Sequence, residues 1–574
     1  MNSIPVWSTP CKFSRTRPVG RIGPGTCLFL WIAFAGFGVP GGAAAQAIPR
    51  AAAPGFQAAP APSLHALFFP PIVATGAVPT PDDTIAVTGT QPYLGQTASG
   101  RGYVLLAPGH AALTNPILVV EGFDLDNSMD WDELYTLLNQ EALVESLGAR
   151  GYDAVVLDFT DATDYIQRNA FVFTALLGEI EAAIDPGQTI PVVGPSMGGL
   201  VARYGLAWLE ANAIPHRVRT FISFDAPQRG ANIPLGLQHW VDFFAGQSAD
   251  AATFRTILNS PAARQMLVYQ FGSTAGQTAA ADPLRSALVA DLAAVGDYPA
   301  QPRRVAFANG AGDGTGQGYA PGAQVINYNY NAFPILINGN VWAVPNGGPT
   351  QIFQGRIRIF LISDMQKNVT VTGTRPYDSA PGGWRASMAQ LDTTAAPYGD
   401  IVALHDAHCF IPTVSALDVD DQDLYRDLSA VPDVAAESPF DAVYWQPSNE
   451  EHVHISQLTA QHVLEELVMP VVGVAPGDPA LAFTLDPVRP NPARSGARVS
   501  LRFTLPREGT ASLGIFDTAG RLVRSLAAGT FAPGPHTVTW DLRDEGGRLV
   551  RTGLYFVRGA SGGAVRGQRI VAIQ

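Results

Sequence analysis

Residues 194–198 read Gly-Pro-Ser-Met-Gly and place a serine between two glycines in the pattern Gly-x-Ser-x-Gly. A serine hydroxyl attacks acyl carbon atoms when a neighbouring base removes its proton. An apolar run at 190–193 precedes Ser196, and residues 199–210 have helical spacing. A strand that turns sharply into a helix holds the hydroxyl clear of the sheet and directs the helix N-terminus at developing negative charge. We therefore expect Ser196 to be a nucleophile.

The base that such a serine needs is expected late in the chain, because the order in this setting is serine, acid, histidine. His452 and His454 follow a strand-like run at 440–445 and precede an amphipathic stretch, whereas His462 falls inside that stretch. A histidine in the loop after a final strand can reach over the serine. We expect His452 to be the base, with His454 as the alternative.

The acid that orients the base has three candidates. Asp406 lies just before the apolar run at 409–417, Asp313 follows a strand-like run at 304–308, and Asp418 closes the 409–417 run. Each follows or borders a predicted element at about the required place in the chain. We rank Asp406 first, then Asp313 and Asp418.

Two backbone N–H groups are expected to stabilise the oxyanion. One belongs to the residue after the nucleophile, and the other to the loop after an earlier strand. Met197 supplies the first. The turn at 121–124, directly after the apolar run 116–120, supplies the second through Phe123.

Short apolar runs alternate with longer amphipathic ones between about residues 82 and 470 and position these groups. The runs at 116–120, 153–158, 190–193, 220–224 and 304–308 are typical of buried strands, and 131–147, 169–184 and 199–210 have helical spacing. This alternation predicts an α/β fold with a doubly wound, mostly parallel sheet. We assign it to residues 81–472.

Two segments interrupt this alternation. Residues 231–300 are mostly helical and rich in apolar and aromatic residues, so we expect a helical cap that either shapes an acyl site or packs on the core. Residues 320–385 are rich in β-formers punctuated by Gly and Asn, which predicts a β-rich insertion.

The N-terminal region has the features of an export signal. Four basic residues and no acid precede an apolar run at 27–39 and the small residues 43–45, so we expect residues 1–45 to be a cleaved secretory signal. About 13 apolar residues are too few to span a bilayer, and we expect no transmembrane segment. Residues 46–80 are an Ala- and Pro-rich linker. We therefore expect a secreted or cell-surface protein, in which Cys409 is a lone buried thiol.

Beyond a linker at 473–480, residues 481–574 contain short strands separated by turn residues, which predicts a small β-sandwich. Residues 488–574 hold 13 Arg against five acids, whereas the whole chain has a net charge of −13. The acidic balance of the chain argues against a nucleic-acid partner, since that binding depends on clustered cations. The basic module is expected to engage secretion machinery or the cell surface. No ligand run has metal-binding spacing, so we expect neither a metal nor a cofactor.

The larger region resembles the α/β-hydrolase superfamily, and within it secreted bacterial lipases and esterases. The shared features are the turn at Gly122 after an apolar strand, the Gly-x-Ser-x-Gly-Gly motif followed by Leu-Val-Ala-Arg-Tyr, and the stretch Asp-Ala-Pro-Gln-Arg-Gly-Ala at 225–231. Glu121 and Gln228 stand where lipases usually have His. The resemblance implies serine hydrolysis of carboxylic esters without a cofactor, acting on a small molecule, a lipid or a polymer.

The C-terminal region resembles the immunoglobulin-like module of flagellar hook-capping proteins and related secretion or sorting modules. The matching stretches include Phe-Thr-Leu-Pro at 503–506, Trp-Asp at 540–541 and Gly-Leu-Tyr-Phe at 553–556. These motifs indicate the fold of the module, and they leave its task open among sorting, surface retention and stabilisation.

Two other functions remain open from the sequence. The same residues would serve an amidase, a thioesterase or a polyester depolymerase, because one triad supports all acyl transfers. A non-catalytic surface-binding protein on a hydrolase scaffold is the alternative from another class. Reaction of Ser196 with a fluorophosphonate distinguishes this last alternative from an enzyme.

Overall fold

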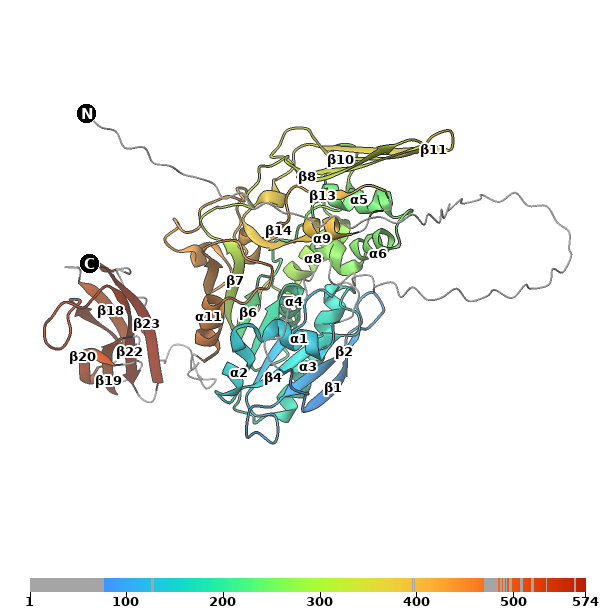
Figure 1. Ribbon diagram of the computed structural model, residues 1–574. Coiled ribbons are helices and arrows are strands. Elements are labelled where there is room, and N and C mark those ends of the chain that lie inside the picture. Colours follow the sequence, from blue (N-terminus) through green and yellow to red (C-terminus); the bar gives the residue numbers. More distant parts are fainter. Residues whose placement is uncertain are drawn as a thin grey trace, which may run out of the picture. The chain divides into compact units, whose positions relative to one another are not determined.

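The structure is a computed structural model that describes residues 77–124, 129–394, 396, 398–468 and, with short gaps, 484–573 (Figure 1). The expected signal at 1–45, the expected linker at 473–480 and most of the linker at 46–80 lie outside the described residues.

An eight-stranded sheet forms the centre of the larger region, with the strand order β1-β2-β4-β3-β5-β6-β7-β15. β1 and β2 pair antiparallel with each other, β2 pairs antiparallel with β4, and the strands from β4 to β15 are parallel. All five runs expected to be strands lie in this sheet. The strands are β1 (Asp83–Thr88), β2 (Ser99–Leu105), β3 (Pro116–Val120), β4 (Asp153–Phe159), β5 (Ile190–Pro195), β6 (Val218–Phe224), β7 (Arg303–Ala311) and β15 (Ala442–Gln446).

Helices cover both faces of the sheet. α3 (Ile166–Ala183) and α4 (Met197–Ala211) pack on one face in the main apolar core, which includes Leu157, Phe173 and Val201. α1 (Trp131–Leu138), α2 (Leu143–Gly148) and α11 (Gln457–Val468) pack on the other face. Parallel strands with helices on both faces, and the elbow described below, make this the expected α/β-hydrolase fold.

The helix expected over 131–147 is divided into α1 and α2. Glu141 and Ala142 have φ of 55° and 52°, which an uninterrupted right-handed helix does not allow. Asn139 stabilises the break, because its side-chain oxygen accepts the N–H of Val144 at 3.0 Å. The apolar spacing continues across the break, which explains why the sequence pattern suggests a single helix.

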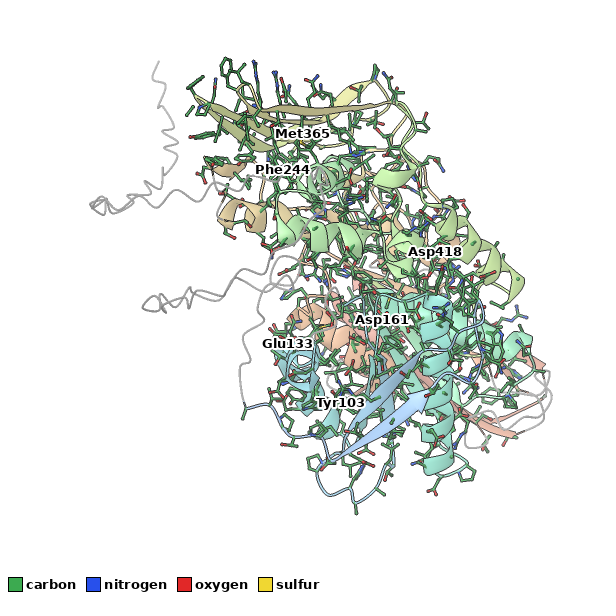
Figure 2. All side chains as sticks on the ribbon, turned by 90° about the vertical axis from the view of Figure 1, so that its right-hand side faces the viewer. Tyr103, Glu133, Asp161, Phe244, Met365 and Asp418 are labelled. Atoms are coloured by element: carbon green, nitrogen blue, oxygen red, sulfur yellow. The ribbon has the colours of Figure 1, made fainter. Side chains whose placement is uncertain are left out.

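The helical cap contains four helices. They are α5 (Leu235–Phe244), α6 (Ala249–Leu258), α7 (Pro261–Met266) and α8 (Pro283–Ala294). Trp240 and Phe244 of α5 pack against Tyr328 and Phe353 of the insertion in a second apolar core. Figure 2 shows Phe244 beside the sheet that carries Met365. The aromatic residues of the cap therefore bury themselves against the insertion.

The insertion consists mainly of a five-stranded antiparallel sheet with the order β11-β10-β9-β8-β13. A separate strand pair, β12 with β14, and the short helices α9 and α10 lie after β11 in the chain, with β13 between α9 and β14, so the inserted structure continues past residue 385. The bounds are β8 (Gln324–Ala332), β9 (Ile335–Trp342), β10 (Thr350–Ile359), β11 (Ser363–Val371), β12 (Gly382–Arg385), α9 (Ser387–Thr393), β13 (Ile401–Ala403), β14 (His408–Pro412) and α10 (Thr413–Ala416).

The C-terminal module is an all-β sandwich with its own apolar core around the fully buried Trp540. One sheet has the order β16-β18-β21 and the other has the order β17-β23-β22-β19-β20. No helix in the described part of the chain is long and apolar enough to cross a membrane. The strands are β16 (Thr484–Leu485), β17 (Ala493–Arg494), β18 (Val499–Leu505), β19 (Gly509–Phe516), β20 (Leu522–Phe531), β21 (Gly534–Trp540), β22 (Gly553–Ser561) and β23 (Ala564–Ile573).

Candidate active site

Ser196 lies in the turn between β5 and α4, at the carboxyl edge of the central sheet. Its backbone has φ 52° and ψ −130°, a conformation that L-residues rarely adopt. The backbone is held there because Ser196 N–H donates to Phe224 O at 2.9 Å, and Gly199 N–H donates to Ser196 O at 3.1 Å. The turn leaves the side chain half-buried at the N-terminus of α4.

The glycines around Ser196 are required by close backbone approach. A Cβ at Gly198 would lie 2.1 Å from Val120 O, and a Cβ at Gly194 would lie 2.6 Å from the Gly198 carbonyl. A Cβ at Gly199 would lie 2.4 Å from Ala226 Cβ. The motif therefore lets β5, α4 and the end of β3 meet at one point, which a larger residue at any of these positions would prevent.

His452 reaches Ser196 from the loop that follows β15. Its Nε2 lies 2.8 Å from Ser196 Oγ, which places the imidazole to accept the hydroxyl proton. The backbone N–H of His452 donates to Trp384 O at 3.0 Å. The Phe410 ring packs edge-on against the imidazole, with 4.9 Å between the two ring centroids. His454 points elsewhere, with Nδ1 3.2 Å from Glu450 Oε2. The structure thus brings His452 to the serine, and not the alternative, His454.

The acid beside His452 is Asp225, which was not among the three carboxylates considered from the sequence. His452 Nδ1 lies 2.7 Å from Asp225 Oδ2, and Asn309 N–H donates to Asp225 Oδ1 at 3.0 Å. The Asp225 side chain is fully buried. Its carboxylate therefore has two polar partners that hold it toward the imidazole.

The three expected acids lie in other surroundings. Asp406 is exposed on the turn before β14, and Asp313 is exposed after β7, where its side chain accepts the N–H of Thr315 at 2.9 Å. The Asp418 carboxylate accepts from Arg229 at 3.0 Å and from the Tyr298 hydroxyl at 2.5 Å. The ranking Asp406, Asp313, Asp418 is corrected to Asp225, because none of the three faces His452.

A sequence signal for Asp225 exists in the strand pattern. β5 and β6 are parallel neighbours, and Pro195 pairs with Phe224 at their last residues. Ser196 and Asp225 are the next residues, so both leave the sheet at the same edge. Asp225 also has a positive φ of 45°. Treating every acid directly after a predicted parallel strand as a candidate would have included it.

The turn after β3 lies against the nucleophile. A Cβ at Gly122 would lie 3.2 Å from Ser196 Cβ, which places the Phe123 backbone beside the hydroxyl. Within the described part of the chain the Phe123 N–H has no acceptor, and Met197 begins α4, where helical N–H groups lack intrahelical partners. Both expected donors are thus placed near Ser196.

Glu121 fixes this turn from beneath. Its Oε2 accepts the Phe159 N–H at 2.6 Å, and its own N–H donates to Leu157 O at 3.2 Å. Burial, together with the nearby Asp158 carboxylate, raises the pKa of the Glu121 carboxyl well above its usual range. Glu121 therefore holds the β3 turn against β4, in the position where lipases usually have His.

The electrostatic environment keeps His452 neutral. Burial lowers the pKa of His452, the Asp225 carboxylate opposes this effect, and the Arg385 guanidinium adds to it. Arg385 is itself buried on β12 and lies 3.3 Å from Glu451. A neutral imidazole can accept the Ser196 proton at neutral pH.

A small, mostly apolar pocket opens beside the serine. Gly122, Phe123, Pro195 and Ser196 line it together with Val453, the residue after His452. Its remaining walls come from β3, β4 and α1, and from Glu121 and Met129 next to these elements. Among the described residues that line it, none belongs to the cap helices. The pocket therefore lies between the oxyanion turn and the nucleophile.

The described residues bring no group of three or more His, Cys, Asp and Glu side chains into a metal-binding cluster. Cys409 is buried, with Sγ 3.7 Å from Pro381 O.

Comparison with known proteins identifies the C-terminal module. Residues 489–561 match the model of the FlgD Ig-like domain family. The chain also aligns with FlgD from P. aeruginosa, at 17% identity over 17% of this chain and 76% of that protein, with a TM-score of 0.13. No curated protein sequence matches the chain.

Two further solved structures align with part of the chain. Est1E from Butyrivibrio proteoclasticus is 14% identical over 25% of this chain and 50% of its own length, with a TM-score of 0.19. XC6422 from Xanthomonas campestris, an α/β serine hydrolase without a lid, is 18% identical over 26% of this chain and 65% of its own, also with a TM-score of 0.19. The chain thus spans less than two thirds of either protein.

Proposed function

We propose that this protein is a serine hydrolase that cleaves carboxylic esters through an acyl-enzyme on Ser196. The observation that supports the proposal best is the continuous chain of contacts from Ser196 Oγ to His452 Nε2 at 2.8 Å and from His452 Nδ1 to Asp225 at 2.7 Å. This is the arrangement that activates a serine hydroxyl.

In the first half-reaction, His452 takes the proton of Ser196 as Oγ attacks the ester carbonyl carbon. The Phe123 and Met197 amides stabilise the oxyanion that forms, and Asp225 stabilises the imidazolium. His452 then returns the proton to the alcohol, which leaves. In the second half-reaction His452 activates water, which releases the acid and restores Ser196. None of these steps needs a cofactor.

Amides, thioesters and polyesters remain alternative substrates for the same residues. The non-catalytic alternative, a surface-binding protein, receives no support from the contacts around Ser196, because a retired site would not need all three side chains aligned. We also propose that the protein is exported to the cell surface or the medium, and that the FlgD Ig-like module engages secretion machinery or the surface.

The test is hydrolysis of p-nitrophenyl esters from acetate to palmitate by the protein without residues 1–45 and by its Ser196→Ala variant. We expect turnover that Ser196→Ala abolishes. Labelling of the unsubstituted protein, but not of Ser196→Ala, by a fluorophosphonate would identify the nucleophile independently of the substrate. If neither assay gives a signal, the enzyme proposal is wrong; labelling without ester turnover would point to amides, thioesters or polymers.

A further inference from the structure

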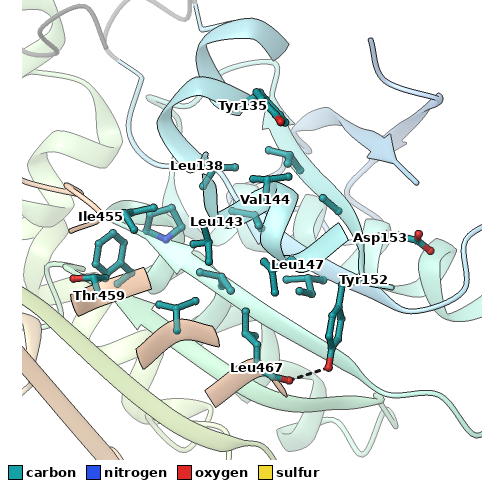
Figure 3. Close-up of a pocket in the computed structure, with 18 of the residues that line it drawn as sticks. Tyr135, Leu138, Leu143, Val144, Leu147, Tyr152, Asp153, Ile455, Thr459 and Leu467 are labelled. Carbon is teal, nitrogen blue, oxygen red and sulfur yellow. Dashed lines mark hydrogen bonds between the residues drawn. The ribbon is translucent and has the colours of Figure 1, made fainter. Parts of the chain in front are cut away.

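A second apolar cavity adjoins the pocket at Ser196 and continues into the body of the fold. Val119, Leu138, Val156 and Pro195 line both the pocket and this cavity, so the two share a wall. Figure 3 shows the cavity between the sheet and the helices α1, α2 and α11. It therefore starts near the reacting atoms and extends away from them.

The direction of the cavity follows from its walls. Thr459, Val463 and Leu467 line it at four-residue intervals along α11, which at 1.5 Å per residue is about 12 Å from first to last. Ile455 lines it just before this helix. On the sheet side the lining residues run down β4 from Val156 to Ala154 and on to Tyr152. The cavity thus passes from the carboxyl edge of the sheet, where Ser196 lies, toward the amino edge.

The walls offer no free polar group to a ligand. The Tyr152 hydroxyl donates to Leu467 O at 3.1 Å, and Thr459 Oγ1 accepts from Gln446 at 2.5 Å. The Asp153 carboxylate accepts the N–H groups of Ala107 and Thr114, each at 2.7 Å. Because these polar side chains already have hydrogen-bond partners, the cavity favours binding of an apolar ligand over a polar one.

We propose that this cavity holds the acyl chain of the substrate, so that the enzyme prefers esters of linear acyl chains of roughly four to six carbons, because the cavity has a volume of about 70 Å³ and a cavity of about 150 Å³ holds one benzene molecule. The proposal rests on the proposed ester hydrolysis at Ser196. It places the acyl chain inside the α/β core, under α1 and α2, and assigns no acyl site to the cap. The cap has its own small apolar pocket, which Leu237, Val241, Phe254, Leu258 and Leu391 help to line, and no triad residue lines it.

The experiment compares kcat/KM for p-nitrophenyl esters from butyrate to palmitate in the protein and two variants. Ala154→Leu adds bulk to the far part of the core cavity, and Leu391→Phe adds bulk to the cap pocket as the matched control. Each methylene that becomes buried adds about 0.8 kcal/mol, so we expect kcat/KM to rise up to about fourfold per methylene until the cavity is full. Ala154→Leu should lower the ratio of kcat/KM for hexanoate to that for butyrate at least tenfold, whereas Leu391→Phe should leave this ratio unchanged. Retained labelling of Ser196 by a fluorophosphonate shows that each variant is folded.

An unchanged chain-length profile in Ala154→Leu, or a shortened profile in Leu391→Phe, would overturn the proposal while ester hydrolysis stands. If no ester is hydrolysed, the proposed function itself fails. The cavity is then tested by calorimetric titration of hexanoate into Ser196→Ala, with and without Ala154→Leu. Absence of binding, or equal binding by both, would refute the cavity proposal independently of catalysis.

A separate observation concerns two neighbouring turns of the insertion. The β8–β9 turn carries Phe333, and the β10–β11 turn carries Phe360, Leu361 and Ile362. Phe333, Leu361 and Ile362 are 83%, 92% and 79% exposed. The Phe360 N–H donates to Pro334 O at 2.9 Å, and the rings of Phe333 and Phe360 lie 5.4 Å apart. The two turns therefore form one apolar tip, which also includes the 44% exposed Met365.

The tip is held out on regular strands. β9 pairs with both β8 and β10, and Ile335 lies opposite Ile359 at the end of the sheet. Figure 1 shows the β10–β11 hairpin reaching beyond α5. Large exposed apolar patches usually mark interaction sites, and this one lies at the end of a projecting sheet.

The charge around the tip differs in sign from that of the chain. Residues 324–371 contain Arg356, Arg358 and Lys367 but one acid, Asp364, whereas the whole chain has a net charge of −13. Arg356 pairs with Asp364 at 2.7 Å, and Lys367 pairs with Asp242 of α5 at 2.8 Å. An excess of basic side chains behind apolar residues favours an anionic lipid surface.

We infer that the tip inserts into an anionic phospholipid surface and docks the protein there. The test is co-sedimentation with vesicles of phosphatidylcholine and phosphatidylglycerol, using the protein and the double variant Leu361→Asp, Ile362→Asp. Leu94→Asp is the matched control, because Leu94 is also exposed, at 66%, and lies in the β1–β2 connection.

We expect the double variant to lose at least tenfold in vesicle binding, and Leu94→Asp to bind normally. Hydrolysis of soluble butyrate esters should be equal in all three proteins. Failure of the unsubstituted protein to bind vesicles, or equal binding by the double variant, would refute the inference. A dimer that the double substitution dissociates, seen by light scattering without vesicle binding, would show that the tip joins two copies of the chain instead.

Discussion

The three side chains at the centre of the site differ in how they are held. The strained backbone of Ser196 positions its hydroxyl. The Asp225 carboxylate is instead held by hydrogen bonds, to Asn309 N–H at 3.0 Å and to His452. Asp225 is also fully buried, so its carboxylate has no water to replace a lost partner. Asp225 is therefore the residue that fixes the Nδ1 side of the imidazole.

We predict that Asp225→Asn lowers kcat for a p-nitrophenyl ester by about 10⁴-fold, because the amide favours the wrong imidazole tautomer. Asp406→Asn is the matched control and should leave kcat unchanged, since Asp406 is exposed and the carboxylate beside His452 belongs to Asp225. Steady-state kinetics of both variants decide between the two aspartates. A large loss in Asp406→Asn with a normal Asp225→Asn would reverse the assignment made from the contacts.

The pH dependence of the reaction should report the protonation of His452. The base works only when neutral, and burial together with Arg385 lowers its pKa below the usual 6.5. We predict that the acid limb of kcat/KM has its midpoint below pH 6.5. Arg385→Met removes the positive charge that opposes protonation, so the midpoint should move to higher pH. A pH profile that is unchanged in Arg385→Met would show that the guanidinium has no influence on the base.

At the scale of elements, the site depends on how closely β3, β5 and α4 approach one another. Gly198 lies where a Cβ would be 2.1 Å from Val120 O. The end of β3 carries the Phe123 turn, so any displacement of this contact moves one oxyanion donor away from Ser196. The insertion contributes as well, because β12 supplies the carbonyl of Trp384 that holds the His452 loop and β14 supplies Phe410.

We predict that Gly198→Ala lowers kcat/KM at least 10²-fold, the usual effect of losing one oxyanion donor, and destabilises the fold by about 1–3 kcal/mol through overpacking. Gly178→Ala on α3 is the control, because a Cβ there meets no atom within 4 Å. This substitution should keep full activity and stabilise the helix by up to about 1 kcal/mol. Urea unfolding and ester kinetics on both variants measure the two effects.

At the scale of the whole molecule, the described chain contains two kinds of fold with separate apolar cores. The core around Trp540 consists entirely of residues of the C-terminal module, and the cores around Ser196 contain none of them. The module is therefore expected to unfold on its own and to leave hydrolysis undisturbed.

We predict that Trp540→Ala destabilises the C-terminal module by about 3–5 kcal/mol, since Trp540 is fully buried. In the full chain this should lower one calorimetric transition and leave a second transition, and the kcat for a butyrate ester, unchanged. Leu522→Ala, at an exposed site of the same module, should change neither transition by more than about 0.5 kcal/mol. A parallel loss of ester hydrolysis in Trp540→Ala would show that the two parts depend on each other.

The local sequence determined the features that depend on neighbouring residues. Apolar runs identified the parallel strands of the central sheet, because a buried parallel strand must be apolar along its length. The antiparallel strands β1 and β2 at the edge of the sheet were not predicted. The elbow at Ser196 was predictable from a strand, a glycine-flanked serine and a helix in direct succession. The motifs of the C-terminal module likewise lie within short turns and strands.

Only the tertiary structure decided which side chains meet across long separations. His452 and Asp225 are 227 residues apart, and the acid was mistaken because chain order alone allowed several aspartates after Ser196. The strand register that brings Ser196 and Asp225 to one edge is a property of the folded sheet. The cavity under α1 and α2 and the apolar tip are also properties of the tertiary structure. Each forms where elements from separate parts of the chain pack side by side, and no local sequence pattern encodes that packing.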